Sequence, residues 1–539
     1  MVSFIISLVA LVIGYVVYGR LVERVFGPDS RRVTPAVSRQ DGVDFMPLPT
    51  WKVYMIQFLN IAGTGPIFGA IMGAKFGPAS YLWIVFGCIF AGAVHDYMTG
   101  MLSMRHDGAS LPELVGHYLG RGTRTVMLVF SIVLLLLVGT VFVYSPALIL
   151  GDIAGFMPTP KGSIMVWVLI VFAYYVVATL LPVDKIIGKV YPVFAFALLF
   201  MAAALMVGLF VKWPSLPEVL DGLGNLGAAQ GLKGMATQPV FPCLFITIAC
   251  GALSGFHATQ SPIMARCLKN ERMGRPVFYG AMITEGIVAL VWAAVSSYFF
   301  FDGGAAEVGA DLTAAAPTVV TKVSEAWLGI VGGILAILGV VAAPITSGDT
   351  AFRSARLIIA DFFHLEQKKY RNRLLIALPV FLVSCLLLWY NVADENGFNV
   401  IWRYFGWANQ TLACFALWMA TVYLTVNPRF GSRGYRNAYW MTLVPALFMT
   451  CVCTTYICIA KEGFRLSQPV SYAIGGVALV AAAVWFFAWK KRIGTIGTMG
   501  TIGTMGTMGA DGSSGNPGNS VNPGNSGNSG TAGPDALNS

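Results

Sequence analysis

Residues 51–73 read WKVYMIQFLNIAGTGPIFGAIMG, an apolar segment that Gly63-Thr64-Gly65-Pro66 interrupts near its middle. At about 1.5 Å per residue, the segment is long enough to cross a bilayer. The glycines permit a non-helical backbone, and Pro66 suits the first turn of a new helix because its missing N–H leaves no donor unpaired. We therefore predict a membrane-spanning helix that is broken at its centre.

Residues 241–266, FPCLFITIACGALSGFHATQSPIMAR, repeat this design. Gly251 and Gly255 loosen the backbone, while Ser261 is expected to cap the second half of the helix and Pro262 to begin it. A merely kinked helix is the alternative for either segment alone, because neighbouring groups in a membrane protein can satisfy the freed backbone. The occurrence of two such segments favours two broken helices.

Hydrophobic residues make up 56% of the 539-residue chain, and charged residues only 11%. Soluble domains carry about 25% charged residues, so this chain cannot cover a surface that faces water. The net charge of +10 does not indicate a nucleic-acid binder, because the Lys and Arg residues fall in short gaps between apolar runs. The nine cysteines include no CxxC pair, which favours cysteine as a small packing residue. The composition predicts an integral membrane protein.

The length needed to cross a bilayer predicts about thirteen spans. They lie near residues 1–19, 51–74, 79–104, 125–150, 163–181, 189–212, 240–265, 276–301, 326–346, 372–391, 404–425, 438–460 and 470–489. Every second connection, together with the C-terminal tail, holds 27 of the 35 Lys and Arg residues, and the remaining connections hold 8. Because basic residues favour the cytoplasmic side, we predict an outside N-terminus and a cytoplasmic C-terminus.

The second broken span is the fifth after the first, so the chain contains two sets of five spans with opposite topology. Paired interruptions in inverted repeats are typical of secondary transporters. We therefore predict an all-α polytopic membrane protein with a 5+5 inverted repeat, like the leucine-transporter fold of the amino acid–polyamine–cation superfamily. The predicted parts are a first helix with a basic cytoplasmic loop (1–50), the first repeat (51–212), the inverted second repeat (240–425), two additional helices (438–490) and a disordered Gly/Asn/Ser/Thr-rich tail (493–539).

The two breaks are predicted to form the substrate site. A half-helix that begins inside the membrane presents free N–H groups and the positive end of its dipole, which suit a carboxylate. Unwound backbone survives at this depth only where it lines a cavity or is buried in protein. The predicted substrate-binding residues are Asn60, Gly63, Thr64, Gly65, Pro66, Gly255, His257, Gln260 and Ser261.

Four ionisable residues inside predicted spans are candidates for ion coupling: His95, Asp96, His257 and Glu285. Ionisable groups at membrane depth are costly and usually functional. Glu285 lies about ten residues into its span, where a carboxyl group suits a proton carrier. For His95 and Asp96, a hydrogen-bonded brace near the cytoplasmic interface is an equal alternative.

Hydroxyl groups follow the ninth predicted span at Thr346 and Ser347. They could join carbonyl groups near Gly63 in a sodium site, and ordinary capping at the end of the span is the alternative. Asn409 and Gln410 are expected to join helices by hydrogen bonds. No metal site is predicted beyond this possible sodium site.

Enzyme and cofactor motifs are absent from the sequence. Residues 63–69 read GxGxxxG, which is not the dinucleotide-binding pattern, and no Walker A, HExxH or GxSxG motif occurs. We therefore predict a transporter without a cofactor rather than an enzyme.

Several long runs resemble the carbon starvation protein A family: IAGTGPIFGAIMGAKFGPASYLWIVFGCIFAGAVHDYMTGMLSMRHDG (61–108), ACGALSGFHATQSP (249–262), YGAMITEG (279–286) and PITSGDTAFR (344–353). The resemblance implies a multi-pass transporter of the bacterial inner membrane that scavenges nutrients when carbon is short. It also implies uptake of small peptides or pyruvate with proton coupling. The alternatives are a sodium-coupled amino-acid or peptide symporter, and a membrane nutrient sensor with a transporter fold, for which a soluble signalling domain would be expected.

Overall fold

The computed structural model describes residues 1–153, 157–180, 187–367, 369–393, 397–427, 435 and 437–499. These residues form helices and no strand, which confirms the predicted all-helical class. Contacts divide the chain into residues 1–485 and residues 486–539. From residue 500 on, the predicted tail lies outside the described residues.

The elements in chain order are α1 (Val2–Val16), α2 (Tyr18–Phe26), α3 (Pro35–Ser38), α4 (Thr50–Ile61), η1 (Gly65–Gly69), α5 (Ala70–Ala74), α6 (Ala79–Phe86), η2 (Gly87–Gly92), α7 (Ala93–Arg105), α8 (Leu111–Leu119), α9 (Arg121–Ile153), α10 (Pro160–Leu180), α11 (Ile187–Lys212), η3 (Val219–Asp221), α12 (Leu226–Ala229), α13 (Val240–Thr247), α14 (Gly255–Ala265), η4 (Glu271–Met273), η5 (Arg275–Gly280), α15 (Ala281–Phe301), α16 (Gly304–Glu307), α17 (Ala316–Phe362), α18 (Tyr370–Ala393), α19 (Gly397–Val426), α20 (Trp440–Ile459) and α21 (Gln468–Met499).

Ten helices among the described residues are long and apolar enough to cross a membrane, and the bent pair of α4 with η1–α5 raises this number to eleven. The bend between the two parts of this pair is 51°. The predicted span 240–265 is divided between α13 and α14, which are 8 and 11 residues long and too short to cross singly. The predicted span 404–425 lies within α19, which is not among the ten.

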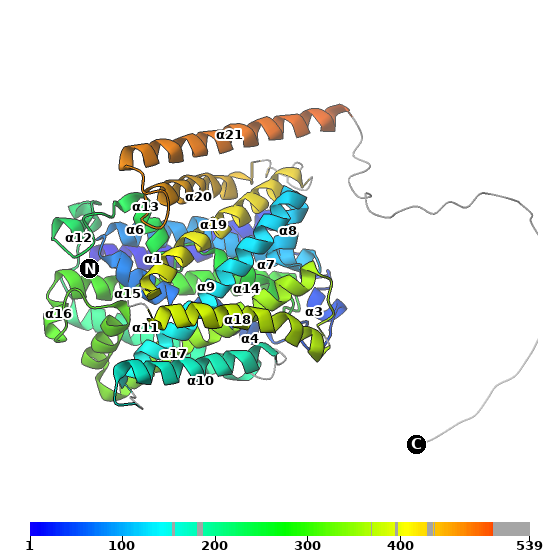
Figure 1. Ribbon diagram of the computed structural model, residues 1–539. Helices are drawn as coiled ribbons and strands as arrows, with labels where there is room; N and C mark the ends of the chain where they lie inside the picture. Colours follow the sequence, from blue (N-terminus) through cyan, green and yellow to red (C-terminus); the bar gives the residue numbers. More distant parts are fainter. Residues whose placement is uncertain are drawn as a thin grey trace, which may run out of the picture. The chain divides into compact units, whose positions relative to one another are not determined.

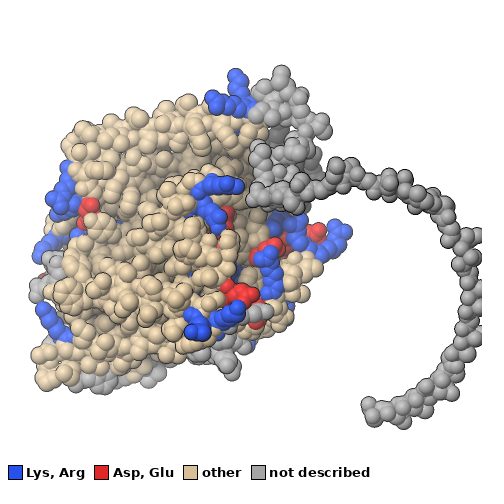
Figure 2. Space-filling model, turned by 45° about the vertical axis from the view of Figure 1, so that its right-hand side comes forward, with Lys and Arg blue, Asp and Glu red and all other residues tan. Residues whose placement is uncertain are grey.

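Some helices are buried by the rest of the protein and others face outward. The apolar windows of Ala79–Arg105 and Glu271–Phe301 are 83% and 89% buried, whereas that of Lys161–Leu180 is 33% buried. Leu386 and Trp389 of α18 are more than two thirds exposed, which is the pattern of a helix that faces lipid. Figure 2 shows a wide uncharged surface, with most of the visible Lys and Arg residues toward its two sides.

Helix α14 lies in the interior and packs against α4, α7, α17 and α19 (Figure 1). These neighbours come from distant parts of the sequence, so α14 is held from several directions. The interior position of α14 places its first turn among buried residues of α7 and α15, where the candidate site lies.

The predicted ninth span, 326–346, ends too early. Helix α17 runs from Ala316 to Phe362, with non-helical backbone at Gly329 (φ +64°), so Thr346 and Ser347 lie inside a helix and do not cap its end. The reason is that the polar residues after Pro344 are buried by neighbouring helices instead of entering solvent. Sequence alone shows their polarity but not their partners.

Two basic residues expected in a loop, Arg353 and Arg356, are also buried in α17 and paired with Asp44. Asp44 Oδ1 lies 3.4 Å from Arg353 Nη1 and 3.2 Å from Arg356 Nη2. Burial disfavours the charged carboxylate, but Arg356 and Arg353 outweigh it and hold the pKa of Asp44 below its ordinary value. The ion pairs fix the loop before α4 onto α17.

Candidate functional site

The first helix break lies between α4 and η1. Residues 62–64 are non-helical or begin the next turn, and Pro66 lies in the first turn of η1, as expected. Asn60 and Thr64 are fully buried, yet both amide atoms of Asn60 and Oγ1 of Thr64 lack a hydrogen-bond partner among the described residues. Buried polar groups are nearly always paired. The break therefore holds unused hydrogen-bonding capacity, which a bound ligand or water can satisfy.

The second break lies between α13 and α14, earlier than the sequence indicates. Helix α14 begins at Gly255 with Ser254 as its N-cap, so Pro262 lies inside the helix and Ser261 is not a cap. The start is fixed from α19, because Asn409 Oδ1 accepts hydrogen bonds from the Phe256 N–H at 2.6 Å and from Ser254 Oγ at 3.1 Å. This cap comes from a distant helix, so local sequence could not show it.

The two breaks adjoin each other. A Cβ atom added at Gly65 would lie 2.4 Å from Sγ of Cys250, and one added at Gly251 would lie 3.7 Å from Cβ of Pro66. Gly251 has φ +91°, a conformation that favours glycine. Gly255 plays a different part, since its added Cβ would meet the backbone of Asn409 at 2.3 Å. It permits close packing of α14 on α19.

The four predicted coupling residues form one buried cluster. His95 Nδ1 lies 2.8 Å from Asp96 Oδ1, and His257 Nδ1 lies 2.9 Å from Asp96 Oδ2. On its other side, His257 Nε2 lies 3.4 Å from Glu285 Oε2. All four side chains are at most 1% exposed. The cluster joins α7, α14 and α15 at the second break, and His257 occupies the first turn of α14 rather than the unwound segment.

The hydrogen bonds of this cluster leave a place for one proton. An ionised Asp96 only accepts hydrogen bonds, so the Nδ1 atoms of His95 and His257 must donate to it. His257 Nε2 and both oxygens of Glu285 have no hydrogen-bond partner among the described residues. If neither carried a proton, two lone-pair atoms would face each other at 3.4 Å in a buried site. A proton on either atom removes that repulsion.

Cys250 lies against the same groups. One ligand atom each of Cys250, His257 and Glu285 lies within 4.8 Å of the other two, the one such group among the described residues. A thiolate, an imidazole and a carboxylate suit a divalent transition metal as well as a proton. Among the described residues, these three are therefore the candidates for holding a metal ion.

The remaining predicted residues line the contact of α14 with α4 and α17. Gln260 Nε2 donates to Ser354 Oγ at 3.1 Å, and Gln57 Nε2 lies 3.4 Å from Ser261 Oγ. Ser261 therefore faces α4, and Gln260 faces α17.

Ser347 reaches the first break, whereas Thr346 does not turn toward it. Ser347 Oγ donates to the carbonyl of Leu59 at 2.9 Å and would lie 3.2 Å from a Cβ at Gly63. Thr346 Oγ1 donates to the carbonyls of Ala343 and Ala342 within its own helix.

Sequence reasoning missed a further buried carboxyl group, Asp349. Its Oδ2 accepts hydrogen bonds from the hydroxyl groups of Tyr191 at 2.5 Å and Tyr174 at 3.1 Å. The early end assigned to the ninth span placed Asp349 in a loop. No continuous apolar run marks the helix at this point, because residues 346–356 read TSGDTAFRSAR.

A family model for carbon starvation protein CstA matches residues 1–154, 149–330 and 318–456. An uncharacterized membrane protein of Haemophilus influenzae is 46% identical over 339 residues, which cover 56% of this chain and 91% of that protein. The peptide transporter CstA of Escherichia coli is 27% identical and is matched over 88% of this chain and 82% of its own length. The pyruvate/proton symporter BtsT of Escherichia coli is also 27% identical, over 81% of this chain and 78% of its own.

A solved structure has a similar fold. The chain matches a mutant manganese transporter of Eremococcus coleocola with a TM-score of 0.55, over 84% of this chain and 99% of that one. Only 12% of the aligned residues are identical, so the likeness concerns the fold alone.

Proposed function

Because the chain belongs to the carbon starvation protein CstA family, we propose that it is a secondary transporter that imports a small carboxylate-bearing nutrient by proton symport. Its cargo is a short peptide or pyruvate, taken up across the bacterial inner membrane when carbon is short. The names of the relatives support both cargoes, since one is a peptide transporter and another a pyruvate/proton symporter. Both substrates carry a carboxylate, and no catalytic step is required.

The buried contact of His257 with Asp96 and Glu285 beside the two breaks carries this proposal. The cluster can exchange a proton, and the adjoining first break offers the unpaired side-chain atoms of Asn60 and Thr64 to a ligand. Binding of an anionic substrate near the cluster favours its protonated form by Coulomb attraction. Proton and substrate therefore stabilise each other's binding, which symport requires.

Sodium coupling is the second candidate. Ser347 lies at the first break, next to the carbonyl of Leu59 and to Gly63, where a sodium ion could replace the hydroxyl hydrogen bond. Thr346 would have to turn from its own helix to take part. Replacement of external sodium by choline leaves uptake unchanged if the proton alone is coupled.

The proposed architecture remains thirteen spans, with α4–α5 and α13–α14 as the broken members of a 5+5 inverted repeat. The proposed boundaries of the parts are those predicted from the sequence, except that α21 continues to Met499, into the predicted tail. The proposed orientation has the N-terminus outside and the C-terminus in the cytoplasm. If Arg353 and Arg356 are left out of the count because they lie inside α17, the cytoplasmic side still holds 25 Lys and Arg residues and the outer side 8.

Uptake by the purified full chain in liposomes tests the proposal. The panel consists of L-alanyl-L-alanine and pyruvate, each with and without an acidic exterior. Accumulation of either substrate above its external concentration, only with the pH gradient, is the expected result. Equal uptake with and without the gradient would contradict proton symport, and no uptake of either substrate would contradict the cargo class.

A further inference from the structure

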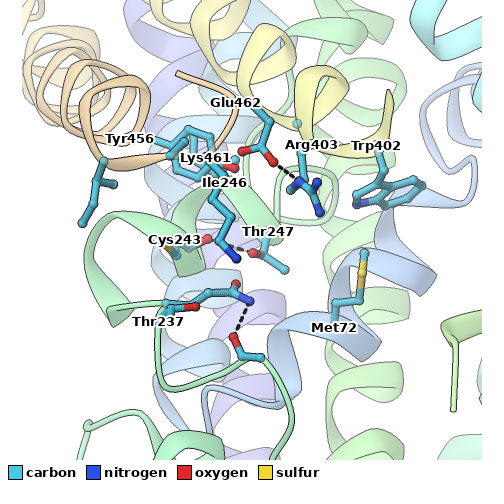
Figure 3. Close-up of a pocket in the computed structure, with 15 residues that line it drawn as sticks. Met72, Thr237, Cys243, Ile246, Thr247, Trp402, Arg403, Tyr456, Lys461 and Glu462 are labelled. Carbon is cyan, nitrogen blue, oxygen red and sulfur yellow. Dashed lines mark hydrogen bonds and ion pairs between the residues drawn. The ribbon is translucent and has the colours of Figure 1, made fainter. Parts of the chain in front are cut away.

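A cavity of about 380 Å³ opens beside the two half-helices that meet at the breaks (Figure 3). Met72 of α5 and Thr247, the last residue of α13, contribute to its wall, and Trp402 and Arg403 of α19 face them. Its rim comes from residues 234–238 and from the segment after α20. The proposed orientation puts this face outside.

Close packing separates the cavity from the breaks. A Cβ at Gly69 would lie 2.9 Å from the carbonyl oxygen of Thr247, and one at Gly73 would lie 2.2 Å from the side chain of Ile248. Small residues spaced by four let helices in membranes approach this closely. The two half-helices therefore pack directly against each other beside the cavity.

The cavity contains both signs of charge. Arg403 forms an ion pair with Glu462, and Lys461 also lines the cavity (Figure 3). Glu462 is 10% exposed and Arg403 is 44% exposed, so the pair lies at the boundary of cavity and solvent. A guanidinium group has five N–H donors, and a single carboxylate partner cannot use them all. Among the described residues, Lys461 forms no ion pair, so its ammonium group can bind an anion.

We propose that this cavity is an outer binding site for a zwitterionic nutrient, an amino acid or a short peptide. Arg403 and Lys461 hold the ligand's carboxylate, and Glu462 holds its ammonium group. This inference rests on the proposed transport function and selects one of its two cargoes. A pyruvate anion has no group that complements Glu462, and the carboxylate would repel it. The wall of Trp402 and Tyr456 gives a peptide side chain an apolar surface.

If the ion pair had only a structural role, it would tie the segment after α20 to α19. Its loss would then affect the uptake of all substrates alike. Three probes separate the two roles: L-alanyl-L-alanine, its N-acetyl derivative without the ammonium group, and its C-terminal amide without the carboxylate. Uptake of each probe and of pyruvate is measured in liposomes that contain the full chain. Each variant is first compared with the unchanged protein by thermal unfolding.

Glu462→Gln is expected to raise the KM for the dipeptide about tenfold at constant kcat, as expected for a lost charged hydrogen bond, and to leave the KM for the N-acetyl derivative unchanged. The double variant Arg403→Gln with Lys461→Gln is expected to raise the KM for the dipeptide and its N-acetyl derivative, but not for the amide. Glu462→Asp keeps the carboxylate and should retain the preference for a free ammonium group. Arg465→Gln is the matched control, because Arg465 is on the same exposed segment but does not line the cavity.

The inference is overturned if Glu462→Gln shifts the KM of the dipeptide and of its N-acetyl derivative together, or if Arg465→Gln has the same effect as the double variant. It is also overturned if the unchanged protein accumulates pyruvate but not the dipeptide, and in that case the proposed function stands. If the unchanged protein accumulates neither substrate, both the inference and the proposed function fail.

Discussion

Gly65→Ala probes the contact between the two helix breaks. The added Cβ would lie 2.4 Å from both Cβ and Sγ of Cys250, about 1 Å closer than ordinary van der Waals contact. Extra atoms in a packed core usually cost about 1–3 kcal/mol. If that cost falls on the conformation that binds substrate, affinity should drop about 5- to 150-fold.

A double-mutant cycle isolates this contact from other effects. Cys250→Gly removes both atoms that the new methyl group would meet, so it should restore most of the affinity lost in Gly65→Ala. Dissociation constants for the dipeptide or pyruvate are measured by calorimetry on purified protein. Gly476→Ala is the control, since a Cβ there meets nothing within 4 Å, whereas one at Gly475 would lie 1.9 Å from Thr455 Oγ1. Strictly additive effects of the two substitutions would refute a direct contact between the breaks.

Three further predictions concern the rest of the chain. Asp44→Ala should lower the free energy of unfolding by about 3–5 kcal/mol, because it removes the carboxylate that pairs with two buried guanidinium groups. In the unchanged protein this stability is present above the ordinary Asp pKa and is lost as the pH falls through the lower pKa of folded Asp44. Unfolding curves are measured in detergent, and a curve like that of the exposed-site control Asp29→Ala would contradict the prediction. Single cysteines in residues 302–325 should react with an impermeant reagent from outside, and labelling only from the cytoplasm would contradict the proposed orientation. Removal of divalent metals by a chelator should leave pH-driven uptake unchanged, whereas loss of uptake with recovery on added zinc would put a metal ion between His257 and Glu285.

Local chemistry predicted the first helix break well. Pro66 marks that break through a property of its own backbone, so its effect can be read without knowledge of any neighbour. Gly63 instead leaves room for Phe142, since an added Cβ would lie 2.6 Å from that ring. Glycine is required at position 65 for a reason other than the expected one. Gly65 does not adopt a left-handed conformation, but its missing side chain permits the close approach of Cys250.

Errors arose where a distant helix supplies the partner. Asn409 of α19 caps α14 and moves its start to Gly255, seven residues before Pro262. Likewise, α17 continues through Asp349 because tyrosine hydroxyl groups from α10 and α11 satisfy that carboxyl group. Polar residues in a membrane segment therefore mark an end of the helix only when no other helix pairs with them.

The candidate coupling residues could be selected one by one, but their arrangement could not. His95, Asp96, His257 and Glu285 stood out because ionisable groups at membrane depth are costly. Their assembly into one hydrogen-bonded cluster depends on the packing of α7, α14 and α15. No spacing in the sequence encodes that three-helix contact.

Accumulation by Glu285→Gln tests the central claim most directly, because the amide keeps the shape of the carboxyl group and cannot exchange a proton. In liposomes with an acidic exterior, the unchanged protein should concentrate its substrate, and Glu285→Gln should only equilibrate it. Exchange of labelled for unlabelled substrate without a gradient should continue in the variant, which shows that binding and the conformational change survive. Glu325→Gln, at an exposed position of α17, should behave like the unchanged protein. Full gradient-driven accumulation by Glu285→Gln would contradict proton coupling through this cluster.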